Sequence, residues 1–245
     1  MDNPYETPRL IAEYLLFHYG TASDHSEVLP IPREAVGFPA RVVQTMCPGT
    51  RRYHRALDLG CAVGRSAFEL TRYADDVLAL DFSAGFIAAA QAMQATGRAS
   101  LTIAGEGVQS IDIDVACPPG LDRSRARFEV ADACHLRADI GSFDLLLAAN
   151  LICRLPTPMD FLDRLPTLVS SGGHVVLATP FSWLAEFTPP THWLGNGEQS
   201  SFSALCEILS PNFTLEAQED IPFLIREHAR KFQYGISLAT RWLRH

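Results

Sequence analysis

The segment 55–65, Arg-Ala-Leu-Asp-Leu-Gly-Cys-Ala-Val-Gly-Arg, constrains the fold more than any other part of the chain. A short apolar strand ends near Asp58, and the chain then turns through Gly60 and Gly64 into a helical run. Glycine allows positive φ and a close approach of the backbone to a ligand. A strand that feeds such a turn at the carboxyl edge of a parallel sheet forms the usual nucleotide-binding crevice. The segment therefore predicts an α/β fold with a ligand site at this edge.

The spacing of the glycines distinguishes two kinds of ligand. Dinucleotide folds use G-x-G-x-x-G, with the pyrophosphate at the helix N-terminus. Here the pattern is D-x-G-x-x-x-G, and a carboxylate at Asp58 would repel a pyrophosphate. The same carboxylate could hold a cationic methionyl ammonium through bound water or backbone. An ordinary corner between a strand and a helix is the structural alternative.

This segment resembles the first motif of class I S-adenosylmethionine-dependent methyltransferases, whose fuller form is D-x-G-x-G-x-G. Ala62 replaces the middle glycine, which adds one methyl group. The resemblance implies S-adenosyl-L-methionine as the cofactor. The residues of the segment that we expect to contact it are Asp58, Gly60, Cys61, Ala62 and Gly64.

Composition describes an ordinary globular chain, 47% hydrophobic and 20% charged, with a formal net charge of −8. Phosphate contacts normally require a concentrated basic surface, so the charge argues against a nucleic-acid partner, although a local basic patch could exist within an acidic total. The longest apolar run, 145–153, is too short to span a bilayer, and the N-terminus carries no secretory pattern. We therefore expect neither a membrane partner nor a targeting segment.

The six cysteines at 47, 61, 117, 134, 153 and 206 form no C-x-x-C pair and show no zinc-ligand spacing. Several lie inside apolar or motif segments, where buried free thiols are common. We interpret them as reduced thiols in a cytoplasmic protein without a metal site.

Strands and helices alternate along the chain, and the strands are continuous apolar runs rather than alternating ones. Burial on both faces, and hence a parallel sheet, follows from that pattern. The expected strands are 55–59, 77–81, 127–130, 143–149 and 174–179, and the expected helices are 8–19, 64–73, 84–96, 159–169 and 202–209. Pro166 should disturb the last turn of its helix, and the Ser-Gly-Gly run at 171–173 should end that helical segment before the strand at 174.

Two extended segments near 213–217 and 236–242 should close the sheet as an antiparallel pair, which is typical of class I methyltransferases. The predicted fold class is a doubly wound, Rossmann-like α/β fold with a seven-stranded, mostly parallel sheet. Residues 1–245 should form one domain, with 1–50 a helical cap and 51–245 the core. Within the core, about 101–122 should be a surface insertion, because its alternating Ile-Asp-Ile-Asp-Val suggests a half-exposed strand.

Further cofactor contacts are expected where the other parallel strands end. Asp81, 23 residues after Asp58, should accept the ribose hydroxyls, with Phe82 beside it. Asp132 and Ala133 should face the adenine. Asn150 follows the fourth strand, where class I enzymes place the residue that meets the methyl group and the acceptor. The alternatives are a helix cap for Asp81, turn chemistry for Asp132 and a satisfied core amide for Asn150.

Beyond these motifs, the chain is similar to the 4-mercaptohistidine N1-methyltransferase family of ovothiol biosynthesis from about Tyr5 to Trp242. The segments that carry the resemblance are 53–72, 147–152 with Arg154 and Leu155, 179–189, 193–195 and 225–233. The resemblance implies methylation of an imidazole nitrogen of 5-thiohistidine (4-mercaptohistidine) to give ovothiol A. In that family the module usually follows an iron-dependent sulfoxide synthase domain, absent from this sequence, so a functional link to such an enzyme is implied.

An amino-acid acceptor requires a cation for its carboxylate, an acceptor for its ammonium and flat walls for its ring. Each candidate has a structural alternative: a solvated basic surface, a core aromatic anchor or, for His18, a surface histidine. For the carboxylate the candidates are Arg154, Arg226, Arg230 and Lys231, and on a helix Arg226 and Arg230 would share a face. The other candidates are Glu227 and Asn150 for the ammonium or the ring N–H, Phe181, Trp183 and Trp193 for walls or a lid, and Tyr14, Phe17 and His18 on one side of the N-terminal helix.

Two other functions share the same cofactor residues. One is a methyltransferase for another small molecule, which would differ only after Asn150. The other is a noncatalytic subunit that binds S-adenosylmethionine. The methylated ring nitrogen, the use of a general base and the oligomeric state stay open at this point.

Overall fold

The computed structural model of the protein describes residues 4–26, 29–47, 49–195 and 197–245. In chain order, its strands are β1 (Tyr53–Leu59), β2 (Ala74–Asp81), β3 (Arg98–Ala104), β4 (Ser110–Ala116), β5 (Ala126–Val130), β6 (Phe143–Ala149), β7 (Val169–Thr179), β8 (Phe213–His228) and β9 (Lys231–Arg244). Its α-helices are α1 (Pro8–Tyr19), α2 (Ala22–His25), α3 (Phe38–Met46), α4 (Arg65–Leu70), α5 (Ala84–Thr96), α6 (Pro158–Leu162), α7 (Leu165–Leu168) and α8 (Ser201–Leu209). Short 3-10 helices are η1 (Pro4–Glu6), η2 (Arg33–Ala35), η3 (Arg123–Arg125), η4 (Ala138–Ile140), η5 (Ile152–Arg154) and η6 (Pro190–His192).

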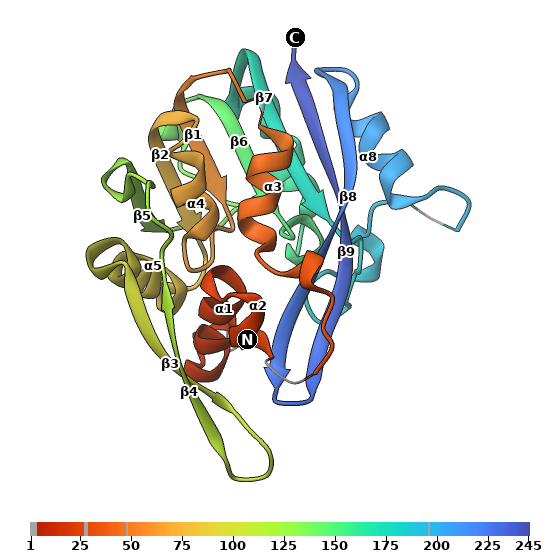
Figure 1. Ribbon diagram of the computed structural model, residues 1–245. Coiled ribbons are helices and arrows are strands. Elements are labelled where there is room, and N and C mark those ends of the chain that lie inside the picture. Colours follow the sequence, from red (N-terminus) through yellow and green to blue (C-terminus); the bar gives the residue numbers. More distant parts are fainter. Residues whose placement is uncertain (1–3, 27–28, 48, 196) are drawn as a thin grey trace.

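The described residues form one seven-stranded sheet in the order β5-β2-β1-β6-β7-β9-β8 (Figure 1). Pairs from β5 through to β7 are parallel, whereas β9 is antiparallel to both β7 and β8. The predicted fold class, a doubly wound α/β sheet with an antiparallel C-terminal strand, is confirmed.

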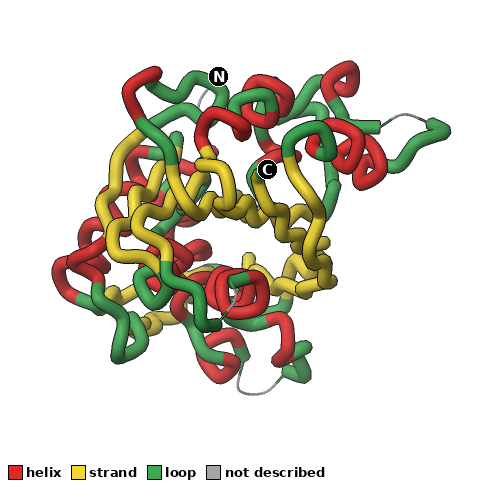
Figure 2. Tube along the Cα trace, turned by 90° about the horizontal axis from the view of Figure 1, so that it is seen from above, coloured by secondary structure: helices red, strands yellow, loops and turns green. Residues whose placement is uncertain are grey.

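Helices cover both faces of this sheet, as Figure 2 shows from above. Along β1, Ala56 points into the core on one face, while Leu57 and Leu59 point into the core on the other. In β6, Leu145 and Leu146 divide in the same way, and each is fully buried. Continuous apolar strands are therefore buried on both sides, and this burial contributes most of the favourable free energy of folding.

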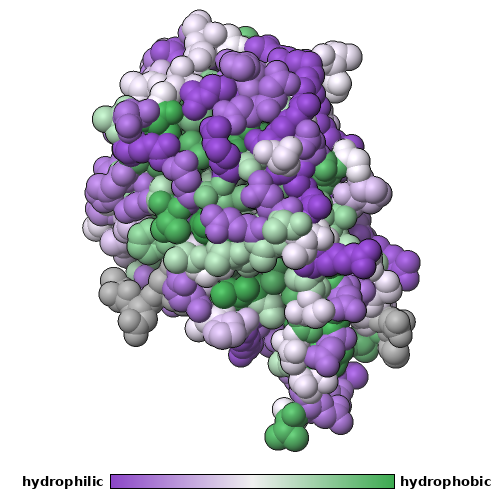
Figure 3. Space-filling view, turned by 90° about the vertical axis from the view of Figure 1, so that its left-hand side faces the viewer, coloured by the Kyte–Doolittle hydropathy of each residue, from purple (hydrophilic) through white to green (hydrophobic). Residues whose placement is uncertain are grey.

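The segment interpreted as an insertion forms an antiparallel hairpin of its own, β3–β4, where only one half-exposed strand was predicted. Its inner side chains, Leu101, Ile103 and Val115, pack against the main core. Its tip is open to solvent, and Val108 there is completely exposed. The hairpin projects below the body of the molecule in Figure 1 and in the space-filling view of Figure 3.

The C-terminal pair is much longer than predicted. Strands β8 and β9 pair from Phe213 to His228 and from Lys231 to Arg244, so the interpretation of Arg226 and Arg230 as one face of a helix is wrong. The physical reason lies in alternate residues of β8. Phe223 and Ile225 point the same way into the core beneath α1 and α3, which favours an extended strand.

Two other boundaries differ from the prediction. The helix expected over 159–169 is divided into α6 and α7, with Pro166 in the first turn of α7, where proline is tolerated. The Ser-Gly-Gly run at 171–173, which was expected to separate this helix from the next strand, lies inside β7, where the β6–β7 register shifts. Gly173 has no room for a side chain, because an added Cβ would lie 2.8 Å from the Ser170 carbonyl oxygen.

Helix α1 lies between the two hairpins and contacts both, as well as α5 (Figure 1). Its Tyr14 ring packs 4.7 Å from Phe86, and its Phe17 ring meets Phe223 edge-on at 6.4 Å. The N-terminal part of the chain therefore lies over the carboxyl edge of the parallel strands. No helix among the described residues is long and apolar enough to cross a membrane.

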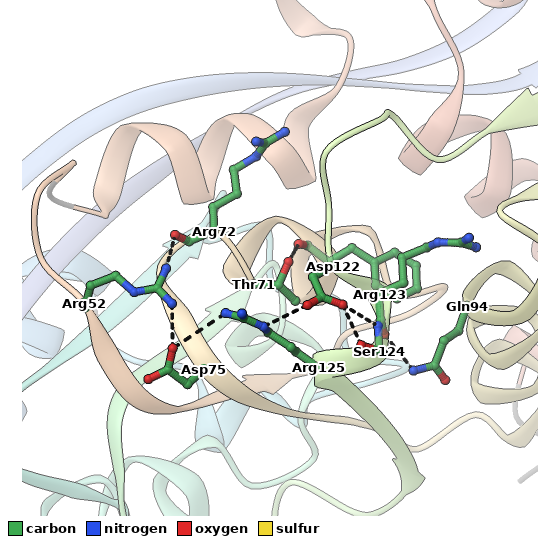
Figure 4. A network of polar contacts seen from close by, with 10 residues as sticks. Arg52, Thr71, Arg72, Asp75, Gln94, Asp122, Arg123, Ser124 and Arg125 are labelled. Carbon is green, nitrogen blue, oxygen red and sulfur yellow. Dashed lines mark hydrogen bonds and ion pairs between the residues drawn. The ribbon is translucent and has the colours of Figure 1, made fainter.

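The amino-terminal edge of the sheet carries arginines that pair with acids (Figure 4). Asp75 binds Arg52 at 2.6 Å and Arg125 at 3.6 Å, and Arg125 also binds Asp122 at 2.9 Å. Exposed pairs of this kind contribute little to stability. They do, however, neutralise one another, so this network is not an unpaired basic surface of the kind that binds phosphates.

Candidate active site

The turn after β1 is shaped by two glycines in the left-handed region, Gly60 with φ of 75° and Gly64 with φ of 90°. A Cβ at Gly60 would lie 3.0 Å from the Leu151 side chain, and one at Gly64 would lie 2.8 Å from Phe128. Ala62 between them also has a positive φ, 45°, which costs free energy in a residue with a Cβ. The turn is therefore held in a conformation that ordinary residues avoid, which is typical of ligand-binding loops.

Asp81 lies where β2 ends and is bound to this turn. Its Oδ2 accepts a hydrogen bond of 2.8 Å from the Ala62 amide, and its Oδ1 accepts one of 2.9 Å from the Ser83 amide. Burial raises the pKa of this carboxyl above its usual value, while the two amide hydrogen bonds oppose the shift. Asp81 was given the alternative role of a helix cap. The residue that caps α5 is Ser83, whose hydroxyl accepts from the Phe86 amide.

Asp58 is buried behind the turn rather than open to solvent. Its Oδ2 accepts a hydrogen bond of 2.6 Å from the Ser66 hydroxyl in the first turn of α4. Burial raises the pKa of Asp58 to about 7, and the nearby Asp81 adds to the shift. The carboxyl thus ties β1 to α4, and its contact with a methionyl ammonium stays a prediction.

Two large apolar side chains are exposed at neighbouring strand ends. Phe82 follows β2 and is 64% exposed, and Val130 ends β5 and is 55% exposed. Asp132 lies close by and accepts from the Cys134 amide at 2.8 Å, next to the buried Ala133. Exposed apolar groups beside a carboxylate suit a flat, polar-edged ring, so the adenine contact predicted for these residues stays compatible with the structure.

Asn150 follows β6 with an unusual backbone conformation. Its φ is 55°, its amide donates to the Ala178 carbonyl at 2.7 Å, and its Oδ1 accepts from the Ser237 hydroxyl at 2.7 Å. Asn150 is half-buried, whereas Ser237 is fully buried. The side-chain oxygen is therefore paired with Ser237, at the open edge of the sheet between the glycine turn and β7.

Sequence reasoning missed the 3-10 turn η1, which covers this edge. The Tyr5 carbonyl accepts from the Ser83 hydroxyl at 3.2 Å, and Glu6 accepts from the Gly85 amide at 3.0 Å. The Tyr5 ring packs against Phe86 at 5.5 Å and stacks on Phe187 at 6.0 Å. The aromatic and acidic residues at 5–6, directly before the predicted helix, were a signal that could have been used.

The three residues predicted on one side of α1 have different surroundings. Tyr14 faces Tyr5 and Phe86 near the carboxyl edge of the parallel strands, whereas the Phe17 ring stacks on Phe38 in the core. His18 is buried, so its interpretation as a surface histidine is wrong. Burial lowers its pKa to about 3, with Arg65 adding to the shift, and its Nδ1 has no hydrogen-bond partner among the described residues.

The loop after β7 is fixed to the end of β6 by Arg154. The guanidinium donates to the Ser182 carbonyl at 2.7 Å and the Cys153 carbonyl at 2.9 Å, and it lies 5.4 Å from the centre of the Phe187 ring. Phe181 has a φ of 48° at the start of this loop. These residues bring a cation and aromatic rings to the edge beside Asn150.

The two tryptophans of this region are anchored by their indole nitrogens. Trp183 donates to the Ser201 hydroxyl and Trp193 to the Thr188 carbonyl, at 2.9 and 2.8 Å respectively. Trp183 also packs against the core on the α8 side of the sheet. Both therefore shape the loop, and a wall role for Trp183 would be secondary to this anchoring.

Arg226, Glu227 and Lys231 are not brought together with Asn150. Arg226 pairs with Phe232 near the tip of the β8–β9 hairpin, five ladder positions from Ser237, or about 16 Å at about 3.3 Å per residue. Its guanidinium donates to the Asp24 carbonyl at 3.0 Å, and Lys231 forms an ion pair with Glu227 at 2.5 Å. These side chains therefore join the two strands of the hairpin at its tip and attach the tip to α2.

Two surface hollows of the described part of the chain lie away from this edge. One, of about 430 Å³, lies between 29–32 and the β8–β9 hairpin, and the other, of about 390 Å³, lies beside Trp193. The edge near Asp81 is instead covered by Tyr5 and Tyr14. All six cysteines are free thiols, and no group of three potential metal ligands occurs among the described residues.

The comparisons with known proteins agree with this geometry. Residues 57–177, which run from β1 through most of β7, match the model of a methyltransferase domain. A search among curated proteins finds no match. Among solved structures, the chain is similar to the N-methyltransferase NodS from Bradyrhizobium japonicum WM9 in complex with S-adenosyl-L-homocysteine, with a TM-score of 0.56, 14% identity and coverage of 96% of this chain and 98% of that one.

It is also similar to the PH0226 protein from Pyrococcus horikoshii OT3, with a TM-score of 0.54 and 17% identity over 85% of this chain and 92% of that one. At these identities the structural likenesses establish the fold. Together with the matched domain they define a class I methyltransferase. The protein is an S-adenosylmethionine-dependent methyltransferase, with S-adenosyl-L-methionine as its cofactor.

Proposed function

We propose that the protein transfers the methyl group of S-adenosylmethionine to an imidazole nitrogen of 5-thiohistidine, giving ovothiol A. One observation carries this proposal. Three segments that resemble the 4-mercaptohistidine N1-methyltransferase family, at 53–72, 147–154 and 179–189, meet at a single edge of the sheet, around the glycine turn and Asn150. Of the other two segments, 193–195 lies in the loop after β7, where Trp193 donates to the Thr188 carbonyl, and 225–233 lies at the tip of the β8–β9 hairpin.

The reaction is an in-line displacement. When bound, S-adenosylmethionine supplies an electrophilic methyl carbon on a sulfonium. The lone pair of the ring nitrogen forms the new N–C bond while the S–C bond breaks. The electron pair of the broken S–C bond stays on sulfur, which leaves a neutral thioether. The ring then loses one proton to solvent or a carboxylate. The chain must hold nitrogen and carbon roughly 3–3.5 Å apart and exclude water.

The cofactor half of the site follows from the strand ends. The glycine turn and Asp58 form the methionyl side, Asp81 accepts the ribose hydroxyls, and Phe82 with Asp132 bounds the adenine. These contacts are supported by the positive φ values of the turn, the carboxylate position of Asp81 and the exposure of Phe82. Tyr5 and Tyr14 close the site and exclude water.

The acceptor half is proposed around Asn150 as the catalytic residue. Phe181 and Phe187 offer flat walls, and Arg154, which is partly exposed, supplies the positive charge for a carboxylate or thiolate. We assign this role to Arg154 rather than to Arg226, because Arg226 is buried and held by the Asp24 carbonyl. No strong base is needed, since a neutral imidazole nitrogen is already nucleophilic.

This function places the protein after a C–S bond-forming step. A second enzyme, which we propose to be an iron-dependent sulfoxide synthase, must supply the thiol-bearing histidine. The free thiols of the chain suit a reducing compartment, so we propose that the protein works in the cytoplasm.

The test is mass spectrometry of purified protein with S-adenosylmethionine and either 5-thiohistidine or histidine. We expect a mass gain of one methyl group on 5-thiohistidine, and a much lower kcat/KM for histidine. A site built to pair with sulfur loses those contacts when sulfur is absent, which costs binding free energy. Asn150→Ala is the control that separates enzymatic from chemical methylation. Equal kcat/KM values for the two acceptors would reject the ovothiol function and favour a methyltransferase for another small molecule.

A further inference from the structure

The hydroxyl of Ser237 lies behind Asn150, on the side away from the cofactor turn. Ser237 belongs to β9, one residue before Leu238, which pairs with Thr179 at the end of β7. Its Oγ donates to Asn150 Oδ1 at 2.7 Å, and its side chain is fully buried. Within the described part of the chain this is the one hydrogen bond that the Asn150 side chain makes.

This contact sets the orientation of the carboxamide, with Oδ1 toward Ser237 and Nδ2 directed away from it. An asparagine side chain has one acceptor oxygen and one NH₂ group with two donors. Because Ser237 occupies Oδ1, Nδ2 is left without a protein acceptor among the described residues. The Asn150 backbone is itself held in place, since its amide donates to the Ala178 carbonyl at 2.7 Å and its φ is 55°.

We infer that Ser237 is a positioning residue that fixes Asn150 as a hydrogen-bond donor toward a lone pair of the methyl acceptor. Asn150 then selects an acceptor that carries a thiolate, carboxylate or unprotonated nitrogen beside the atom to be methylated. A neutral carboxamide is not a base, so Asn150 does not take the ring proton. The inference rests on the proposed function only for the atom that carries this lone pair, which in 5-thiohistidine is the sulfur.

The decisive substitution is Asn150→Asp, which keeps the shape of the side chain but replaces the donor by a carboxylate. We expect kcat/KM for 5-thiohistidine to fall about hundredfold at pH 8, since a charge-assisted hydrogen bond becomes a repulsion. Activity should return in part as the pH is lowered and the carboxyl becomes protonated. Retained activity in Asn150→Asp would mean that Asn150 accepts an N–H, and would overturn the inference.

Ser237→Ala tests the positioning role. We expect KM for the acceptor to rise about tenfold while KM for S-adenosylmethionine stays within about twofold, because only the orientation of Asn150 is lost. The matched control is Thr240→Val, three residues further along β9. Thr240 is equally buried and donates to the Leu177 carbonyl at 3.2 Å, so its loss should lower the Tm without changing either KM. Equal kinetic effects of the two variants would reject the positioning role.

A measurement without any acceptor separates this inference from the proposed function. The side-chain NH₂ signal of Asn150, identified by its absence in Asn150→Asp, should exchange rapidly with water in the protein bound to S-adenosylhomocysteine. An NH₂ group that donates to Ser237 would instead be protected, and would lose that protection in Ser237→Ala. Protected exchange overturns the inference even if 5-thiohistidine is methylated, and rapid exchange supports it even if another acceptor proves correct.

Discussion

The Ala62 amide and the Asp81 carboxylate are joined by a hydrogen bond of 2.8 Å. This bond connects the glycine turn after β1 to the end of β2, so the acid expected to hold the ribose also fixes the loop expected to hold the methionyl group. Asp81 accepts from Ser83 as well, at the start of α5. A change at Asp81 must therefore affect both parts of the cofactor site together.

Asp81→Ala should weaken binding of S-adenosylhomocysteine by about 1–3 kcal/mol, because charge-assisted hydrogen bonds to the ligand and to the turn are lost. Isothermal titration calorimetry measures the change. Asp76→Ala is the matched control, since Asp76 lies in the same strand but pairs with Arg55 and Arg127 near its other end. Wild-type affinity in a folded Asp81→Ala variant would disprove the assignment.

Gly60→Val should abolish cofactor binding while the protein stays folded. A side chain there contacts Leu151 and takes a left-handed φ of 75°, and strain of this kind costs about 1–2 kcal/mol. Gly107→Val separates strain from contact, because Gly107 also has a positive φ, 61°, but nothing lies within 4 Å of its added Cβ. Calorimetry with S-adenosylhomocysteine should distinguish them. If both variants bind normally, the turn has been misassigned.

Asp58 should give the free protein a pH-dependent stability. Burial raises its pKa to about 7 from 3.8, so the folded state binds more protons than the unfolded state between these values. The stability that Asp58 contributes is then present below about pH 4 and is lost as the pH rises through about 7. Urea unfolding of wild type and Asp58→Asn at a series of pH values measures the difference. A difference that does not change with pH would show that Asp58 is ionised throughout.

Arg226→Ala should lower stability rather than acceptor affinity. The truncation leaves the partly buried Asp24 carbonyl without its donor and loosens α2 from the hairpin, at a cost of about 1–3 kcal/mol. Lys231→Ala, at the exposed end of the same hairpin, should change stability by less than about 0.5 kcal/mol. Thermal unfolding checks both. A rise in acceptor KM for Arg226→Ala without loss of Tm would return Arg226 to the acceptor site.

Sequence patterns predicted those parts of the fold in which local chemistry and burial agree. The helix at 8–19 has Pro8 in its first turn and Thr7 as its N-cap, and β6 is apolar except for Asp144, so both boundaries were predicted correctly. The length of β8 could not be predicted, because Phe223 and Ile225 become strand residues only through packing against α1 and α3. Tertiary contacts therefore override local preference there.

In the candidate site, too, some residues could be placed from the sequence and others could not. Gly60, Asp81 and Asn150 follow apolar strands, so their meeting at one edge was predictable from the parallel sheet. Ser237 and Tyr5 reach that edge from opposite ends of the chain, and only the pairing of β9 with β7 and the packing of η1 on Phe86 bring them there. Contacts of such long sequence separation leave no periodic signal in the sequence.

Strand β9 lies between β7 and β8 in the sheet, although it follows both of them in the chain. During translation β8 therefore emerges without a neighbour in the main sheet, and its exposed edge stays open until residues 231–244 leave the ribosome. Residues 231–244 then pair with both β7 and β8 and deliver Ser237 to Asn150 in the same step. A chain that stops at residue 230 would thus keep an open sheet edge and an unsupported Asn150, so forming β9 and completing the active site are one event.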